Sequence, residues 1–69
     1  MKIEGNYLVI NTNGWEYDIP LNELTTEKGL EGWLCHMTEK MWFKSGMAKC
    51  MVTLCEHKFG YKFSGKFSY

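Results

Sequence analysis

Residues 15–43 read WEYDIPLNELTTEKGLEGWLCHMTEKMWF, and this stretch decides the fold class because its hydrophobic period changes partway along. Its first seven side chains alternate between apolar and polar, which is the pattern of a β-strand with one buried face. Apolar side chains then recur at spacings of three and four, from Leu30 to Met41. This second pattern predicts a helix over residues 27–43 with one apolar stripe.

The predicted helix has a capped start and two unusual interior residues. Thr25 and Thr26 can each act as its N-cap, and Glu27 is favourable near the positive end of the helix dipole. Gly29 and Gly32 each cost a helix about 1 kcal/mol relative to alanine. Either they allow another backbone segment to approach closely, or nothing in the fold requires them.

Turn-forming residues place a second strand before this stretch. The β-prone run 7–10 is followed by Asn-Thr-Asn-Gly at 11–14, and the Asn-Gly pair predicts a hairpin that leads into the strand beginning at Trp15. Pro20, near the end of that strand, indicates an edge strand or a strand terminus.

A second helix is expected after the first. Ser45 and Gly46 indicate a break and a new N-cap. Apolar residues at 47, 50, 51 and 54 then predict a shorter amphipathic helix that ends at about His57. So short a connection implies a helical hairpin.

Residues 59–69 carry the clearest alternation in the chain. Aromatic residues occupy odd positions while lysine and serine occupy even ones, and Gly60 and Gly65 are the breaks. This pattern predicts a strand, or a strand bent at Gly65, that completes the sheet with the first hairpin or pairs with a second subunit. The expected fold class is therefore α+β. It is a small antiparallel sheet (N-terminal hairpin plus C-terminal strand) with a two-helix hairpin packed on one face, in the order ββααβ and in a single domain over residues 1–69.

Composition bounds the kind of protein. The chain has 69 residues, with three Trp, four Tyr, four Phe and a hydrophobic fraction of 45%, which fits a small globular domain with a dense core. Pairing buries surface that a lone small domain leaves wet, so we expect a homodimer. There is no run of eighteen apolar residues and no signal-peptide pattern, so we expect no membrane association and a cytoplasmic location.

Charge is unevenly distributed although the formal net charge is zero. Residues 1–39 carry two lysines and seven carboxylates, whereas residues 40–69 carry six lysines and one carboxylate. Such asymmetry indicates an anionic partner for the basic half, or charge pairing within the fold or between subunits. The chain has no arginine, so lysine must supply every permanent positive side-chain charge.

Thiols and imidazoles are candidates for chemistry because they are the ligands that zinc prefers. Their spacing does not fit a zinc site, which presents ligand pairs two to four residues apart with a matching second pair. Cys55 and His57 diverge by about 200° on a helix, so they cannot form a catalytic dyad within it. We therefore expect free buried thiols, no metal, no cofactor and no enzymatic activity. The residues considered are Cys35, His36, Cys50, Cys55 and His57.

The residues that we predict to bind a ligand combine lysine ammonium groups with aromatic rings. Rings stack on bases while ammonium groups meet phosphates, so this combination suits a nucleotide-like anion or single-stranded nucleic acid. The alternative is that the rings belong to the core and the lysines only keep an edge strand soluble. The predicted site residues are Lys40, Trp42, Lys44, Lys49, Lys58, Tyr61 and Lys62.

One further pattern is carried by WEYDIPL at 15–21, LTTE at 24–27, WL at 33–34 and KMW at 40–42. It resembles a pattern in small bacteriophage and prophage proteins of unknown function, where a hairpin strand leads through a capped helix ending Lys-x-Trp to a second helix. The resemblance implies a phage or mobile-element origin. Small accessory proteins of that origin often bind and block host factors.

These expectations define one functional hypothesis. The chain is a small non-enzymatic binding protein, phage-encoded and homodimeric, that sequesters or blocks a host factor in the host cytoplasm as an anti-defence protein. In this hypothesis it binds a nucleotide-like anionic ligand. Two alternatives stay open, a protein–protein inhibitor of a host defence complex and a single-stranded nucleic-acid-binding module. The last of these predicts an affinity that falls steeply with salt.

Overall fold

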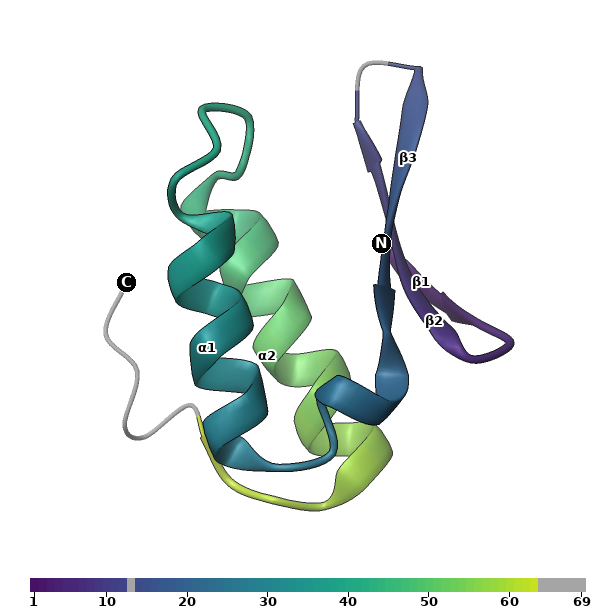
Figure 1. Cartoon of the computed structure of the whole chain (residues 1–69), viewed down its shortest axis with the longest axis vertical. Helices are drawn as coiled ribbons and strands as arrows, with labels where there is room; N and C mark the ends of the chain where they lie inside the picture. The colour runs from purple at the N-terminus through teal and green to yellow at the C-terminus, as the bar shows by residue number, and fades with distance from the viewer. Residues whose placement is uncertain (13, 64–69) are drawn as a thin grey trace.

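The computed structural model describes residues 1–12 and 14–63, and within them three antiparallel strands precede two helices (Figure 1). The α+β class expected from the sequence is confirmed. No helix in the described part of the chain is long and apolar enough to cross a membrane. The elements are β1 (Lys2–Glu4), β2 (Tyr7–Thr12), β3 (Trp15–Pro20), the short 3-10 helix η1 (Leu21–Glu23), α1 (Glu27–Met37) and α2 (Ser45–Phe59).

β2 is the central strand of the sheet, and it pairs antiparallel with β1 on one side and with β3 on the other. The predicted hairpin is the β2–β3 pair, and Gly14 in its turn has φ +85°, a conformation that glycine adopts at little cost. Leu8 lies opposite Ile19 and Ile10 lies opposite Tyr17, so these residues share one face of the sheet. No sequence pattern predicts β1, because three residues are too few for a periodic signal.

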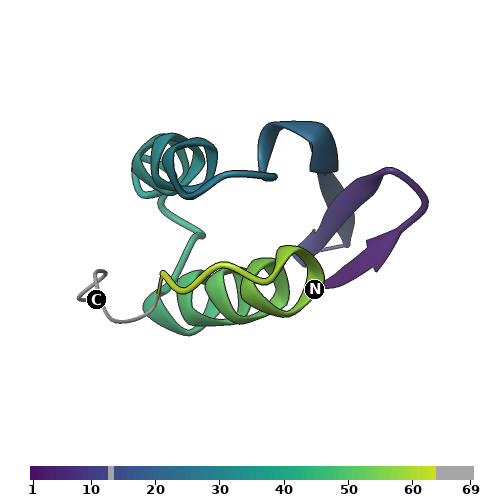
Figure 2. The same ribbon diagram turned by 90° about the horizontal axis from the view of Figure 1, so that it is seen from below.

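Both helices lie on one side of the sheet and run in opposite directions (Figures 1 and 2). Their apolar stripes and the inner face of the sheet form one core. Its least exposed large side chains, each below 2% exposed, are Leu8, Ile10, Ile19, Leu24, Leu30, Leu34, Met37, Met51 and Cys55.

The start of α1 is held by two local interactions. The Thr26 hydroxyl accepts a hydrogen bond from the backbone N–H of Gly29 at 3.1 Å, as the predicted N-cap requires. A Cβ on Gly29 would lie 2.2 Å from the backbone oxygen of Glu23. The backbone of η1 therefore approaches α1 closely at Gly29, which is the first of the two explanations considered for the helix glycines. A Cβ on Gly32, in contrast, would meet nothing within 4 Å.

α1 ends at Met37, so the prediction that it continues to residue 43 is wrong. The Thr38 hydroxyl donates to the carbonyl oxygen of Cys35 at 2.8 Å where the helix stops. The chain then leaves the helix axis, and this change of direction brings Phe43 into the core, where it is 6% exposed. Burial of that ring outweighs the few backbone hydrogen bonds that another turn of helix would add.

The predicted C-terminal strand is wrong over the residues that the structure describes. Phe59 is the last residue of α2, and residues 60–63 form no strand. Gly60 has φ +85° and its N–H donates to the carbonyl oxygen of Glu56 at 2.8 Å, so it ends the helix and redirects the chain. Phe63 then packs into the core, where it is 4% exposed. Residues 64–69, the rest of the predicted strand, lie outside the described residues.

Candidate functional site

The end of β2, the start of β3 and the connection between α1 and α2 lie at the same end of the molecule (Figure 1). Three aromatic rings from these segments meet there. The centroids of Trp15 and Trp42 are 5.3 Å apart with the ring planes at 84°, and those of Tyr17 and Trp42 are 5.7 Å apart at 55°. Such edge-to-face and tilted contacts hold each ring in place. We call this surface, together with Lys40 and Met41 of the same connection, the aromatic tip.

Local structure explains why these residues meet. Trp15 and Tyr17 alternate with acidic residues on β3, so both rings lie on the face of the sheet that turns toward the helices. In the inter-helix connection, the N–H of Phe43 donates to the carbonyl oxygen of Lys40 at 3.1 Å. The buried Phe43 ring also contacts Trp42, with centroids 6.1 Å apart. Phe43 thus anchors the connection and directs Trp42 toward the hairpin.

Lys40 is the positive charge of the aromatic tip. Its Nζ atom lies 5.2 Å from the centroid of the Tyr17 ring, a cation–π contact typically worth about 0.5–1 kcal/mol at a partly exposed site. The ammonium group therefore occupies one face of Tyr17, and that face is not free to stack on a base.

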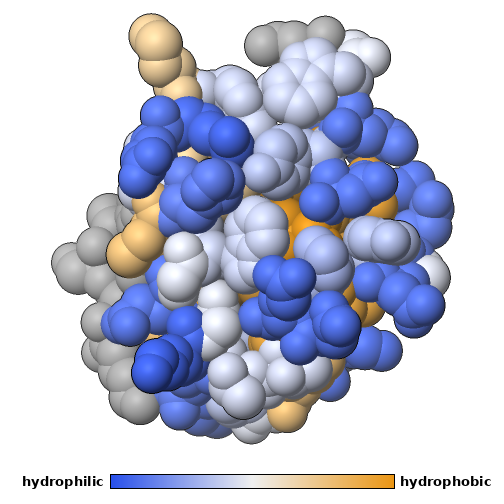
Figure 3. All heavy atoms as spheres, viewed as in Figure 1, coloured by the Kyte–Doolittle hydropathy of each residue, from blue (hydrophilic) through white to orange (hydrophobic). Residues whose placement is uncertain are grey.

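The aromatic tip also exposes large apolar surface. In the described residues only three large hydrophobic or aromatic side chains are exposed: Met41 at 93%, Tyr7 at 47% and Trp15 at 45%. Two of the three belong to the tip. Figure 3 shows that the face seen in Figure 1 is covered mainly by hydrophilic and near-neutral residues. Strongly hydrophobic residues are visible in the gaps between them, and moderately hydrophobic residues at a few projecting points. Exposed Trp and Met side chains in such surroundings are typical of a contact surface.

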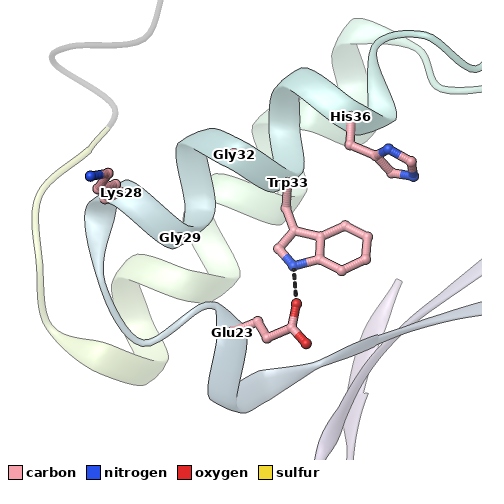
Figure 4. A pocket seen from close by; sticks show the side chains of 6 residues that line it. All are labelled: Glu23, Lys28, Gly29, Gly32, Trp33 and His36. Carbon is pink, nitrogen blue, oxygen red and sulfur yellow. Dashed lines mark hydrogen bonds between the residues drawn. The ribbon is translucent and has the colours of Figure 1, made fainter.

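A pocket of about 390 Å³ lies beside the first turns of α1 (Figure 4). The indole N–H of Trp33 donates to Oε1 of Glu23 at 3.0 Å, which joins α1 to η1 across the pocket. We call this depression, which is widely open to solvent, the α1 pocket. It is lined by Glu23, Lys28, Gly29, Gly32, Trp33 and His36.

His36 connects the α1 pocket to the aromatic tip. Its ring packs edge-on against Trp33, with centroids 5.5 Å apart at 89°. Its Nε2 atom lies 3.5 Å from the hydroxyl oxygen of Tyr17. The pocket and the tip are therefore two parts of one surface between α1 and β3.

The structure does not bring the seven predicted site residues together. Lys40 and Trp42 belong to the aromatic tip. Lys44 is the N-cap of α2, a position that the sequence analysis gives to Ser45 and Gly46, and it makes no side-chain capping bond.

The other four predicted residues lie along α2 or beyond it. Lys49 is exposed in the first half of α2, Lys58 lies in its last turn, and Tyr61 and Lys62 follow the helix. At 1.5 Å per residue, Lys44 and Lys58 are separated by about 21 Å along the axis. The lysines therefore occupy both ends of the helical layer instead of one patch.

Tyr61 has a structural contact. Its hydroxyl donates to the carbonyl oxygen of Leu24 at 2.7 Å, and burial is the main reason that its pKa is raised well above 10.0, with Cys55 as the second cause. The Cys55 thiol is itself buried, which raises its pKa, while a hydrogen bond with Tyr61 opposes the shift. A protonated thiol is a poor nucleophile and a poor metal ligand.

The other two thiols do not follow the expectation of burial. Cys35 and Cys50 are exposed, because each lies one position away from the buried stripe of its helix, next to Leu34 and Met51. Among residues 1–12 and 14–63, no three His, Cys, Asp or Glu side chains gather in a way that could hold a metal ion.

Several residues of this surface are not among the predicted site residues. Trp15 and Tyr17 are expected on the buried face of a strand, and Met41 is expected on the buried stripe of a helix. A useful signal for Trp15 is its place next to the hairpin turn, because a side chain at the end of a strand has fewer neighbours to cover it. Glu23 and Trp33 are ten residues apart, and no local pattern pairs them.

Comparison with known proteins identifies no relative: no protein-family model matches the chain, and neither the curated proteins nor the solved structures give a significant match. The geometry of the aromatic tip and the α1 pocket is therefore the basis on which a function can be proposed.

Proposed function

We propose that this chain is a non-enzymatic binding protein that contacts a protein partner through the aromatic tip. The observation that carries the proposal is exposed apolar surface at the aromatic tip. Trp15 is 45% exposed although its ring contacts Trp42, and Met41, the residue before Trp42, is 93% exposed. Trp and Tyr are enriched among the residues that dominate binding energy, and methionine adapts its shape to an apolar partner. A surface ordered before binding also loses less conformational entropy when the partner arrives.

A protein partner is better supported than a nucleotide-like anion or single-stranded nucleic acid. Base stacking needs open ring faces, whereas Lys40 covers one face of Tyr17 and Trp42 packs against Trp15. Phosphate binding needs converging cations, whereas the predicted lysines lie at both ends of α2. The ring faces are thus occupied by contacts within the fold, and the lysines are too far apart to converge on one anionic ligand.

The resemblance to phage proteins suggests which kind of protein the partner is. We propose that the partner is a host protein in the host cytoplasm. The chain would inhibit a defence complex by covering a surface through which that complex assembles or acts. A second copy of the chain is the other protein that the aromatic tip suits, as expected for a homodimer. Native mass spectrometry of the purified protein measures the number of subunits directly.

The test is an affinity capture that compares surface variants. Met41→Asp places a charge on the aromatic tip at a position exposed enough to leave the fold intact, and Lys49→Gln is a matched exposed change on α2. Wild-type protein and Lys49→Gln should retain the same partner from a nuclease-treated bacterial lysate, or the same self-association, and Met41→Asp should reduce it by about tenfold or more.

Two results would contradict the proposal. One is retention that Met41→Asp leaves unchanged, because the partner would then bind elsewhere. The other is retention that disappears with nuclease or falls steeply with salt, because the bound species would then be a nucleic acid.

A further inference from the structure

The α1 pocket offers an aromatic wall, an open floor and a carboxylate, and together these suit one kind of ligand. Trp33 is the wall, presenting an aromatic surface that is half-buried. Gly29 and Gly32 make the floor, and because a Cβ on Gly32 would meet nothing within 4 Å, the space above that residue is open. Glu23 supplies a carboxylate at the edge of the ring (Figure 4).

The Glu23 carboxylate is held in place by a hydrogen bond, and no lysine of the described residues forms a salt bridge with it. It accepts the indole N–H of Trp33 at 3.0 Å through Oε1, and a carboxylate can accept several more hydrogen bonds. Within residues 1–12 and 14–63 the structure contains one salt bridge, Lys2 to Glu4, and it does not involve Glu23. Figure 4 shows Lys28 at the far end of the pocket, with its ammonium group directed away from Glu23 and Trp33.

We propose that the α1 pocket binds a guanidinium group, carried by an arginine side chain of the protein partner. A guanidinium is planar, stacks on tryptophan and donates several N–H bonds in a fork that matches a carboxylate. The pocket offers both recognition elements side by side, an indole surface and an acceptor fixed at its edge. The proposal depends on the proposed function only in naming a protein as the source of the arginine.

The chain has no guanidinium group of its own that could occupy this pocket. It contains no arginine, so neither the chain itself nor a second copy carries a guanidinium. Because His36 lies between the pocket and Tyr17, a partner that places arginine in the pocket also places its neighbouring residues on the aromatic tip. The partner is thus a different protein with an arginine beside an apolar contact residue.

The probe for the pocket is N-acetyl-arginine amide, whose only charge is the guanidinium. Its isostere N-acetyl-citrulline amide, which has an uncharged urea in place of the guanidinium, is the control ligand. In an NMR titration, the arginine probe should shift the indole N–H signal of Trp33 and the amide signals of Gly29 and Gly32 saturably in the millimolar range. The citrulline probe should bind about tenfold more weakly or worse, because a charge-assisted hydrogen bond is lost.

Two variants locate the binding. Glu23→Gln retains an acceptor for Trp33 but removes the charge, and should weaken the arginine probe about tenfold. Gly32→Leu fills the open floor at an exposed helical position, and should abolish binding without unfolding the chain. Lys49→Gln removes an exposed charge on α2, outside the pocket lining. It is the matched control and should leave the affinity unchanged.

The proposal is overturned by an absence of saturable shifts, by equal binding of the two probes, or by unchanged binding in both Glu23→Gln and Gly32→Leu. This outcome is separate from failure of the proposed function. Met41→Asp should not affect the arginine titration. If a folded Met41→Asp protein binds the arginine probe and still retains the protein partner, the result contradicts partner binding through the aromatic tip but not arginine binding in the α1 pocket.

Discussion

Gly29 and Gly32 lie on the same helix but meet opposite surroundings. A Cβ on Gly29 would come within 2.2 Å of the backbone oxygen of Glu23, whereas one on Gly32 would meet nothing within 4 Å. At Gly29 the missing side chain therefore lets η1 pack against α1, and this packing places Glu23 within reach of the Trp33 indole. At Gly32 the missing side chain keeps the pocket open, and the helix is less stable than it would be with alanine at that position.

This contrast predicts opposite effects of the same substitution. Gly29→Ala should lower the free energy of unfolding by about 1–3 kcal/mol, because backbone must move to admit the methyl group. Gly32→Ala should raise it by about 0.5–1 kcal/mol, because alanine is the better helix former and the site is open. Urea unfolding followed by far-UV circular dichroism measures both. Equal effects at the two positions would show that helix propensity alone governs them.

At the scale of elements, the inter-helix connection separates an anchor from a contact residue. Phe43 is 6% exposed and Met41, two residues earlier, is 93% exposed. The first holds the connection to the core, and the second is free of any packing role. Function and stability therefore divide between neighbouring residues of one short segment.

Alanine substitutions should reveal this division. Phe43→Ala should cost about 3–5 kcal/mol, because it removes a buried aromatic ring and leaves a cavity. Met41→Ala should change stability by less than about 0.5 kcal/mol. Thermal or urea unfolding of the two variants gives the comparison, and a large loss at Met41 would mean that this residue packs against the fold.

The same connection shows where sequence patterns stop being informative. Met41 continues the three-and-four spacing of α1, so periodicity extends the predicted helix to residue 43, although only burial distinguishes a stripe residue from an exposed one. The alternation of β3 and the Thr26 cap are correct predictions, because each depends on neighbours in sequence. The pairing of Glu23 with Trp33 depends on the close approach at Gly29, which is a tertiary property.

The C-terminal segment illustrates a second limit. Phe59, Tyr61 and Phe63 alternate as a strand would, yet the first ends a helix and the other two pack irregularly. A period of two over so few residues does not distinguish a strand from a helix end followed by a glycine turn. Gly60 was the informative residue, because its left-handed conformation ends α2.

At the scale of the whole molecule, residues after α2 close a small core. The Tyr61 hydroxyl donates to the carbonyl oxygen of Leu24 at 2.7 Å, a contact between residues 37 positions apart. The N–H of Phe63 donates to the side chain of Glu56 at 2.6 Å, and the Phe63 ring completes the core. A chain of 69 residues forms few long-range contacts, because it buries only a small core. The hydrogen bond between the residue before α1 and the segment after α2 therefore contributes a large share of its stability.

Tyr61→Phe should therefore lower the free energy of unfolding by about 1–2 kcal/mol near neutral pH, because a partly buried carbonyl loses its donor. Burial, with Cys55 as a second cause, raises the pKa of Tyr61 above its ordinary value of 10.0 in the folded state. Below pH 10 the phenol is protonated in both states and its contribution is complete. Above pH 10 the unfolded chain loses the proton first, so stability falls as pH rises further.

Urea unfolding at about pH 8 and about pH 11 tests this sign. The stability difference between wild type and Tyr61→Phe should shrink or reverse at the higher pH, because the variant has no phenol to ionise. Loss of stability from the buried Cys55 thiol begins nearer its ordinary pKa of 9.0, and it affects both proteins. Tyr7→Phe, at an exposed tyrosine on β2, should behave as wild type at both pH values. A difference for Tyr61→Phe that is constant with pH would mean that the phenol is equally easy to ionise in the folded and unfolded chain. No difference at about pH 8 would mean that the hydroxyl does not stabilise the core.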